Sequence, residues 1–255
     1  ITLIFMRNIQ LFKSIIFASL LTNLGFINAQ TIKNTERTKV NINSNWSYID
    51  NSTKSLNEVN KSTNWVTLNL PHTWNSQDAT DLDPGYRRSA SWYKKNINFS
   101  EIDTNKLYSL YFEGSNVTTN VYVNGKEAGG HIGGYIGFTI DITNFITTGD
   151  NEILVRVDNS FNIEIIPSQK SDFTIYGGIT RDVWLESTLK NHIDNFKITT
   201  PAVSAKSASL SLLTTVKNIK AGSDLSLKAV LKNPKGKVVA TKTVAVAGEE
   251  TKIVF

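Results

Sequence analysis

Residues 110–138 have the sequence LYFEGSNVTTNVYVNGKEAGGHIGGYIGF, and this stretch decides the fold class. Leu107–Phe112 has the apolar and aromatic composition of a buried strand that ends at Glu113-Gly114, and Val117–Val123 has that of the next strand. Asn124-Gly125 follows directly, and this pair favours a type I′ hairpin turn because both positions need positive φ angles. The stretch therefore predicts antiparallel strands joined by a tight turn.

The same pattern continues on both sides of this stretch. Short runs rich in Val, Ile, Thr, Tyr, Phe and Trp recur about every ten residues from Asn41 onward, separated by Gly, Asn, Asp or Pro. Phe138–Ile142 and Ile153–Val157 are two such runs, and Gly149-Asp150-Asn151 between them predicts a turn. We find no helical periodicity. The pattern predicts an all-β protein whose first domain, residues 40–190, is a jelly roll or sandwich of two antiparallel sheets.

The composition changes near Lys190, where we expect a domain boundary. Aromatic residues become rare after this point, and Ala, Ser, Thr, Lys and Val take their place. Leu225–Leu231 alternates apolar and polar residues, and residues 233–236 (NPKG) predict a turn, which is typical of an immunoglobulin-like β-sandwich. Such a sandwich needs about 100 residues. We therefore expect residues 191–255 to be a truncated domain of this type.

Residues 1–29 have the layout of a signal peptide. Arg7 and Lys13 precede the apolar run Ile15–Phe26, small Ala29 stands at the expected cleavage point, and Met6 is the expected start. The alternative is a transmembrane anchor, but the apolar run is shorter than the ~20 residues that a span needs. We therefore expect a bacterial protein that is secreted or periplasmic, with no membrane span once the signal peptide is removed.

Composition and spacing argue against several classes of function. The sequence contains no cysteine, which rules out disulfides and thiol nucleophiles within it. Residues 30–255 hold 25 basic and 22 acidic residues, a balance too even to indicate nucleic-acid binding. His72, His131 and His192 lack metal-ligand spacing, which argues against zinc. The glycine-rich run 129–135 lacks the lysine and the helix of a phosphate-binding loop, and no G-x-S-x-G nucleophile motif occurs.

Six motifs in a fixed order carry a family resemblance. They are LPHTWN (70–75), DPGYRRSASWYKK (83–95), the stretch 110–138, DIT (141–143), GDNEILVRVDNS (149–160) and DFTIYGGITRDVWL (172–185). Together they resemble the N-terminal sugar-binding domain of glycoside hydrolase family 2, over nearly all of residues 46–190. That family contains β-galactosidases, β-glucuronidases and β-mannosidases, and the motifs are most similar to those of secreted β-galactosidases of the Bacteroides type.

The resemblance implies a jelly-roll domain, an immunoglobulin-like domain and then a (β/α)₈ barrel with two catalytic glutamates. It implies retaining hydrolysis of terminal β-galactosides, with one carboxylate as acid/base and the other as nucleophile. A barrel needs about 250 residues, so we expect no catalytic residue in this chain and no activity of the chain alone. The expected partners are a β-galactoside-type carbohydrate and the barrel, with no cofactor required. The alternatives are a free-standing carbohydrate-binding module (a lectin) and an adhesive surface protein.

Three residues are candidate substrate ligands. The resemblance implies that Asp172 matches an aspartate that reaches the active site, binds sugar hydroxyls and can hold a monovalent cation; an ionised carboxylate suits these tasks. The resemblance also implies that the full-length enzyme can hold a monovalent or divalent cation. It also implies that the loop of Asn75 can present an amide to the substrate. Trp74, like Trp92 and Tyr93, can stack on a pyranose. The structural alternatives are a turn residue at Asp172 and sandwich core for the aromatic residues.

Overall fold

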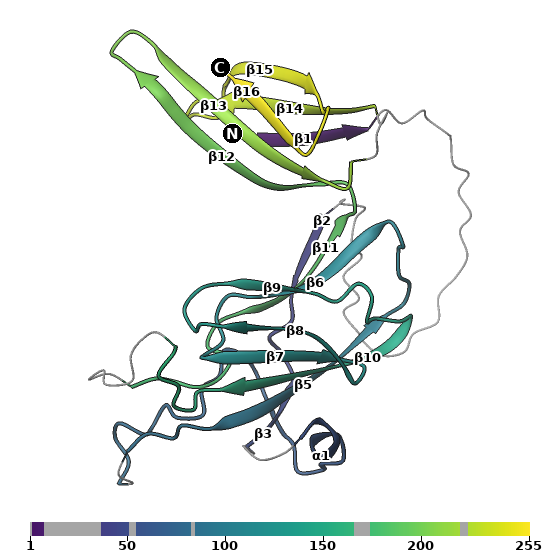
Figure 1. Cartoon of the computed structure of the whole chain (residues 1–255), viewed down its shortest axis with the longest axis vertical. Helices are drawn as coiled ribbons and strands as arrows, with labels where there is room; N and C mark the ends of the chain where they lie inside the picture. Colours follow the sequence, from purple (N-terminus) through teal and green to yellow (C-terminus); the bar gives the residue numbers. More distant parts are fainter. Residues whose placement is uncertain (1, 8–36, 51–54, 83–84, 166–173, 220–223) are drawn as a thin grey trace, which may run out of the picture. The chain divides into compact units, whose positions relative to one another are not determined.

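The computed structural model describes residues 2–7, 37–50, 55–82, 85–165, 174–219 and 224–255, with only the backbone described for 2–7. The chain divides into two compact units (Figure 1). The larger unit comprises Asn34–Leu189, and the smaller one comprises Lys190–Phe255 together with Ile1–Lys33. The structure is almost entirely β, as the sequence predicts.

The larger unit is a sandwich of two antiparallel sheets (Figure 1). One sheet has the strand order β4-β3-β5-β10-β7-β8, and the other has the order β2-β11-β6-β9. The strands are β2 (Arg37–Asn41), β3 (Trp46–Ile49), β4 (Val66–Leu68), β5 (Ala90–Phe99), β6 (Lys106–Phe112), β7 (Thr118–Val123), β8 (Lys126–Ile132), β9 (Phe138–Asp141), β10 (Gly149–Asp158) and β11 (Val183–Leu189).

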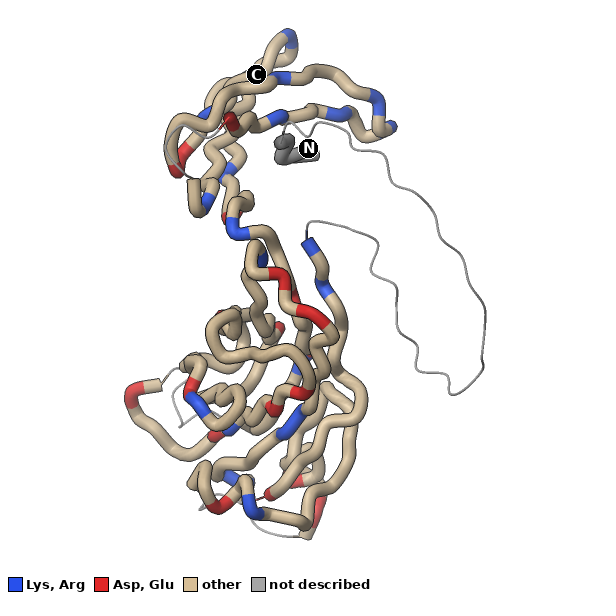
Figure 2. The backbone as a smooth tube through the Cα atoms, turned by 90° about the vertical axis from the view of Figure 1, so that its right-hand side faces the viewer, with Lys and Arg blue, Asp and Glu red and all other residues tan. Residues whose placement is uncertain are grey.

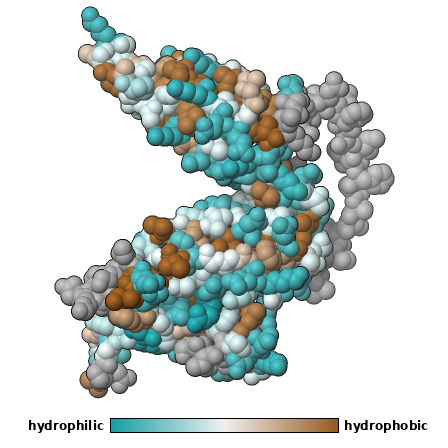
Figure 3. All heavy atoms as spheres, in the orientation of Figure 1, coloured by the Kyte–Doolittle hydropathy of each residue, from teal (hydrophilic) through white to brown (hydrophobic). Residues whose placement is uncertain are grey.

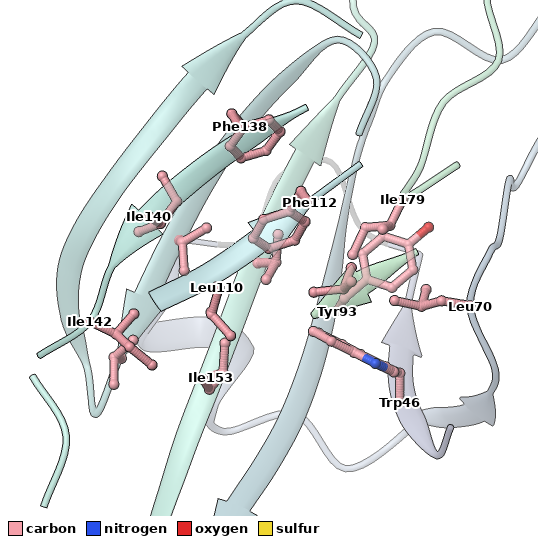
Figure 4. Packing of buried hydrophobic residues seen from close by; sticks show 14 of the residues in the cluster. Trp46, Leu70, Tyr93, Leu110, Phe112, Phe138, Ile140, Ile142, Ile153 and Ile179 are labelled. Carbon is pink, nitrogen blue, oxygen red and sulfur yellow. The ribbon is translucent and has the colours of Figure 1, made fainter. Parts of the chain in front are cut away.

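The main core lies between these two sheets (Figure 4). Alternation along each strand sends every second side chain inward, as at Ile153, Val155 and Val157 of β10. The rings of Phe112 and Phe138 stack with their centroids 4.9 Å apart. The buried residues labelled in Figure 4 are Trp46, Leu70, Tyr93, Leu110, Phe112, Phe138, Ile140, Ile142, Ile153 and Ile179.

A second, smaller core includes Trp92 and Leu154 and lies on the other face of the six-stranded sheet. These side chains point away from the main core because each neighbours a residue that points into it. Helix α1 (Leu56–Asn60) contributes its buried Val59 to this smaller core. The expectation of no helix is wrong here, because a single turn of five residues is too short to show helical periodicity.

The hairpin turn at Asn124-Gly125 has φ angles of 52° and 76°, the positive values that the sequence predicts. The turn predicted at Gly149-Asp150-Asn151 is wrong, because these residues begin β10 and pair with β5. Asn151 explains the difference, since its buried amide shapes the chain that precedes it. Its Oδ1 accepts a hydrogen bond from the Thr147 N–H (2.7 Å), and its Nδ2 donates to the Thr147 carbonyl (2.7 Å).

The smaller unit is also a β-sandwich. Its sheets have the orders β12-β13-β16 and β1-β14-β15. The strands are β1 (Thr2–Arg7), β12 (His192–Val203), β13 (Ala208–Lys217), β14 (Leu225–Lys232), β15 (Val238–Ala245) and β16 (Glu250–Val254). Its core contains Leu212, Val216, Leu225, Leu227, Ala229, Val246 and Ile253.

The predicted signal peptide coincides only in part with the described residues. Thr2–Arg7 forms β1, which pairs with β14, and residues 8–29 lie outside the described ranges. Within those ranges, no helix combines the length and the apolar character that a membrane crossing requires.

We predict that Asn151→Ala lowers the free energy of unfolding of the larger unit by about 3 kcal/mol. The substitution removes the Asn151 partner of the Thr147 N–H, the Thr147 carbonyl and the Gly149 carbonyl, and it removes one of the two acceptors of the Asn124 amide. Urea unfolding followed by tryptophan fluorescence measures the effect.

Asn98→Ala is the matched control for this prediction. Asn98 is exposed on the neighbouring strand and donates to the Asp150 carboxylate (2.7 Å). Its removal is expected to cost less than about 0.5 kcal/mol. Equal losses of unfolding free energy in the two variants would mean that the Asn151 amide does not stabilise the chain between Thr147 and Asn151.

Candidate functional site

Two loops that lie about a hundred residues apart in sequence pair along their backbones. The Trp74 N–H donates to the Gly177 carbonyl (3.3 Å), and the His72 N–H donates to the Ile179 carbonyl (2.8 Å). The first loop follows β4, and the second precedes β11. They therefore bring the motifs LPHTWN and DFTIYGGITRDVWL together.

The side chain of Asn75 is completely buried at this junction. Its Oδ1 accepts hydrogen bonds from the Thr73 hydroxyl and the Gly177 N–H, both at 2.9 Å. Its Nδ2 donates to the Ile175 carbonyl (3.2 Å). In this structure the amide faces the protein and joins the two loops, so the geometry gives no support to the predicted contact with substrate.

A second buried amide, that of Asn159, extends the junction to a third segment. Its Nδ2 donates to the carbonyls of Ile175 (3.0 Å) and Arg87 (3.2 Å). Its Oδ1 accepts from the Ser89 N–H (2.9 Å), and its carbonyl accepts from Arg88 Nε (2.6 Å). The end of β10 is thereby tied to the segment before β5 and to the loop before β11.

Trp74 is half-buried and packs tightly beside Gly177. A Cβ atom at Gly177 would lie 2.1 Å from Trp74 Cζ2, a distance that no real side chain can tolerate. The Arg87 guanidinium lies 4.8 Å from the Trp74 ring centroid, in a cation–π arrangement. The predicted stacking of Trp74 on a sugar stays a prediction.

Several contacts fix the position of the Arg87 guanidinium. The arginine forms an ion pair with Asp50 and donates to the hydroxyls of Tyr48 (3.1 Å) and Ser91 (2.7 Å). Its backbone N–H donates to the Asp78 carboxylate (2.6 Å). The arginine is therefore a fixed structural element beside Trp74.

A cavity of about 340 Å³ opens between the two paired loops. Its lining consists of Pro71, His72, Thr73, Ser76, Tyr176 and Thr180. These side chains offer hydroxyl groups and an imidazole, and the lining includes no carboxylate from the described residues. Most of the exposed lining is apolar, and its hydroxyls and imidazole can donate and accept hydrogen bonds, so the cavity suits a ligand that combines an apolar face with hydroxyl groups.

His72 is held in its neutral form. Burial lowers its pKa below the usual 6.5, and the positive charge of Arg87 lowers that pKa further. Its Nδ1 lies 2.8 Å from the hydroxyl of Tyr93. Burial raises the pKa of Tyr93 well above its usual value, so the hydroxyl keeps its proton at neutral pH.

The other predicted site residues have different outcomes. Asp172 lies outside the described residues, so its contact with a sugar or a cation stays a prediction. Trp92 and Tyr93 are buried core residues, as the structural alternative proposed. In the part of the chain that the structure describes, no group of three or more His, Asp or Glu side chains is arranged to hold a metal ion.

Sequence reasoning missed the residues that line the cavity, notably His72, Tyr176 and Thr180. The spacing of His72 in the sequence bears only on metal binding, which it argues against. Tyr176 directly precedes Gly177-Gly178 and Thr180 follows two residues after Gly178; this glycine pair is a local signal of a close approach between loops. The partner of that approach could not be identified from the sequence alone.

We predict that the stability of the larger unit falls as the pH drops below about 6.5, and that part of this fall disappears in His72→Gln. The folded state holds the His72 proton more weakly than the unfolded state does, because the pKa of His72 is lowered. Protonation therefore favours unfolding between the unfolded-state pKa and the lower folded-state pKa. Thermal midpoints of both proteins between pH 8 and pH 5 measure the difference. Parallel curves for the two proteins would refute the assignment.

Comparisons with known proteins agree on one family. The family model described as "Glycosyl hydrolases family 2, sugar binding domain" matches residues 36–189. A relative from Formosa agariphila, named "Putative beta-glucuronidase", is 55% identical over 86% of this chain and 26% of its own length. A β-galactosidase from Thermoanaerobacter pseudethanolicus is 30% identical over 76% of this chain and 26% of its own length.

Solved structures agree with these sequences. The solved structure described as "Bacteroides uniformis beta-glucuronidase 2 covalently bound to cyclophellitol-6-carboxylate aziridine" has a TM-score of 0.74 and 30% identity, over 86% of this chain and 27% of that one. The chain spans about a quarter of the length of the curated relatives that it matches. The matched domain, its fold and the relatives together show that the chain belongs to glycoside hydrolase family 2, with its sugar-binding domain at residues 36–189.

Proposed function

We propose that this chain is the non-catalytic, sugar-binding part of a longer glycosidase that hydrolyses terminal β-glycosides. The cavity between the paired loops carries the proposal, because its lining combines hydroxyls and a neutral imidazole but offers no carboxylate among the described residues. A retaining glycosidase needs two carboxylates about 5 Å apart. The catalytic pair then belongs to a barrel elsewhere in the same protein, and this chain supplies contacts that orient the sugar.

Exposed apolar side chains on the neighbouring loops support this arrangement. Leu82 and Ile163 are almost fully exposed, and Phe161 is 67% exposed. The loop that carries Leu82 ends beside the start of the loop that carries Phe161 and Ile163, because Ser89 and Arg88 bind Asn159. In Figure 3, brown apolar side chains gather at the lower left of the view. Large apolar side chains that cluster at a surface often mark a contact with another domain.

We propose β-glucuronides as the first substrate class and β-galactosides as the second. The motifs alone favoured galactosides, but the relative that is 55% identical carries a β-glucuronidase name, as does a 34% identical relative from Bacteroides fragilis. The β-galactosidase named above is less similar, at 30% identity. These names support the order of the two classes.

Export is part of the same proposal. The signal-peptide pattern of residues 1–29 would direct the protein to the periplasm or out of the cell, where it would meet carbohydrate. The cation predicted at Asp172 is proposed for the whole enzyme only.

We predict that Tyr176→Ala raises the KM of the whole protein about tenfold and changes kcat less, because Tyr176 lines the cavity and would contact bound sugar. Initial rates on aryl β-glucuronide, β-galactoside and β-mannoside measure the effect and rank the substrates. Asp172→Ala is expected to lower activity more strongly, and the 255-residue chain alone is expected to cleave none of the three.

Tyr135→Ala is the control for this experiment. Tyr135 is 52% exposed, close to the 42% of Tyr176, but it does not line the cavity. Equal KM and kcat values for the two tyrosine variants would mean that the cavity is not part of the substrate-binding site. A whole protein that binds sugars but cleaves no substrate would favour the alternative, a carbohydrate-binding module.

A further inference from the structure

Charge is distributed unequally between the two units. Residues 190–255 contain eleven lysines, no arginine and four acidic residues. Residues 34–189 contain thirteen basic and eighteen acidic residues. Figure 2 shows the difference, since blue segments outnumber red ones in the unit that carries the C-terminus. The nearly even charge of the whole sequence conceals a basic smaller unit.

The excess positive charge is greatest on the hairpin of β14 and β15. Residues 225–248 include five lysines and neither aspartate nor glutamate. Four of these lysines, Lys228, Lys232, Lys235 and Lys237, form what we call the lysine arm. Lys232, Lys235 and Lys237 are exposed, and Lys228 is half-buried.

The fold presents these four side chains in a defined arrangement. Lys228 and Lys232 are four residues apart on β14, so they project from the same face about 13 Å from each other. The Asn233 side-chain oxygen accepts hydrogen bonds from the N–H groups of Lys235 and Lys237, both at 3.0 Å. Gly236 completes the turn with a φ of 81°. The turn therefore holds two further lysines next to Lys232.

Within the described part of the chain, none of the four ammonium groups has an ion-pair partner. Lys242, the fifth lysine of the hairpin, differs from them. Its Nζ donates to the Val254 carbonyl and lies 5.7 Å from the Phe255 ring centroid. The lysine arm thus presents four positive charges that the described residues leave free to meet an anion.

We propose that the lysine arm binds an anionic polysaccharide whose charge is carried by uronic-acid carboxylates. Each lysine carries a point charge on a flexible stem, so the cluster can meet the charges of an extended, flexible polyanion without the fixed bidentate geometry of arginine. Single-stranded nucleic acid is usually bound with aromatic stacking, and residues 190–255 contain only two aromatic residues, Phe196 and Phe255. The choice of uronic acid rests on the proposed β-glucuronide activity. The inference that the lysine arm binds an anionic polymer rests on charge and is independent of that activity.

The test measures binding of the 255-residue chain to alginate, a polyuronate, at about 0.1 M salt. Dextran, dextran sulfate and double-stranded DNA are the comparison ligands. We expect the chain to bind alginate more tightly than the comparison ligands, with an affinity that falls as salt rises. The variant K228Q/K232Q/K235Q/K237Q is expected to bind at least about tenfold more weakly.

The matched control is K126Q/K197Q/K206Q/K252Q. It removes the same charge from exposed lysines outside the hairpin and is expected to change the affinity by less than about twofold. Circular dichroism checks that both variants fold. Equal weakening in the two variants, tighter binding to DNA or dextran sulfate, or no binding to alginate would each overturn the proposal. Because the assay needs no catalysis, a whole protein that fails to cleave glucuronides would refute the proposed function and leave this result intact.

Discussion

The Ile175 carbonyl accepts hydrogen bonds from two buried amides, those of Asn75 and Asn159, and the candidate site depends on this junction. A buried amide that loses its partners costs free energy, so each of the three joined segments holds the other two in place. The cavity lies next to this junction, with His72 and Tyr176 on loops from either side. Its shape therefore follows from a polar network rather than from either loop alone.

Neutral groups line the cavity, and burial together with Arg87 keeps His72 uncharged. Charged groups lie elsewhere, with Arg87 held by Asp50 and the lysine arm on the other unit. In the functions proposed above, the larger unit orients a single sugar, and the smaller unit holds an acidic polymer by charge. These two tasks require different physical interactions, and each unit has the composition for one of them.

Much of the fold could be predicted because it depends on local rules. The hairpin at Asn124-Gly125 needs two positive φ angles, which this pair readily adopts wherever it occurs. The turn at Gly149 was misplaced because Asn151 forms hydrogen bonds with Thr147 that composition does not reveal. The motif predicts Asn75 as a ligand because it shows only the residue type, whereas the structure shows that its amide bonds Thr73 and Gly177.

The sequence by itself determined the all-β class, the sandwich of the larger unit and the family. Alternation with a period of two and turn-forming pairs act over a few residues, so they survive without knowledge of the fold. The tertiary structure alone decided which residues share the cavity. Thr73 and Tyr176 meet there only because Gly177 has no side chain and lets Trp74 approach, a contact between positions about a hundred residues apart. No local pattern encodes such a contact, since it depends on the space that other segments leave.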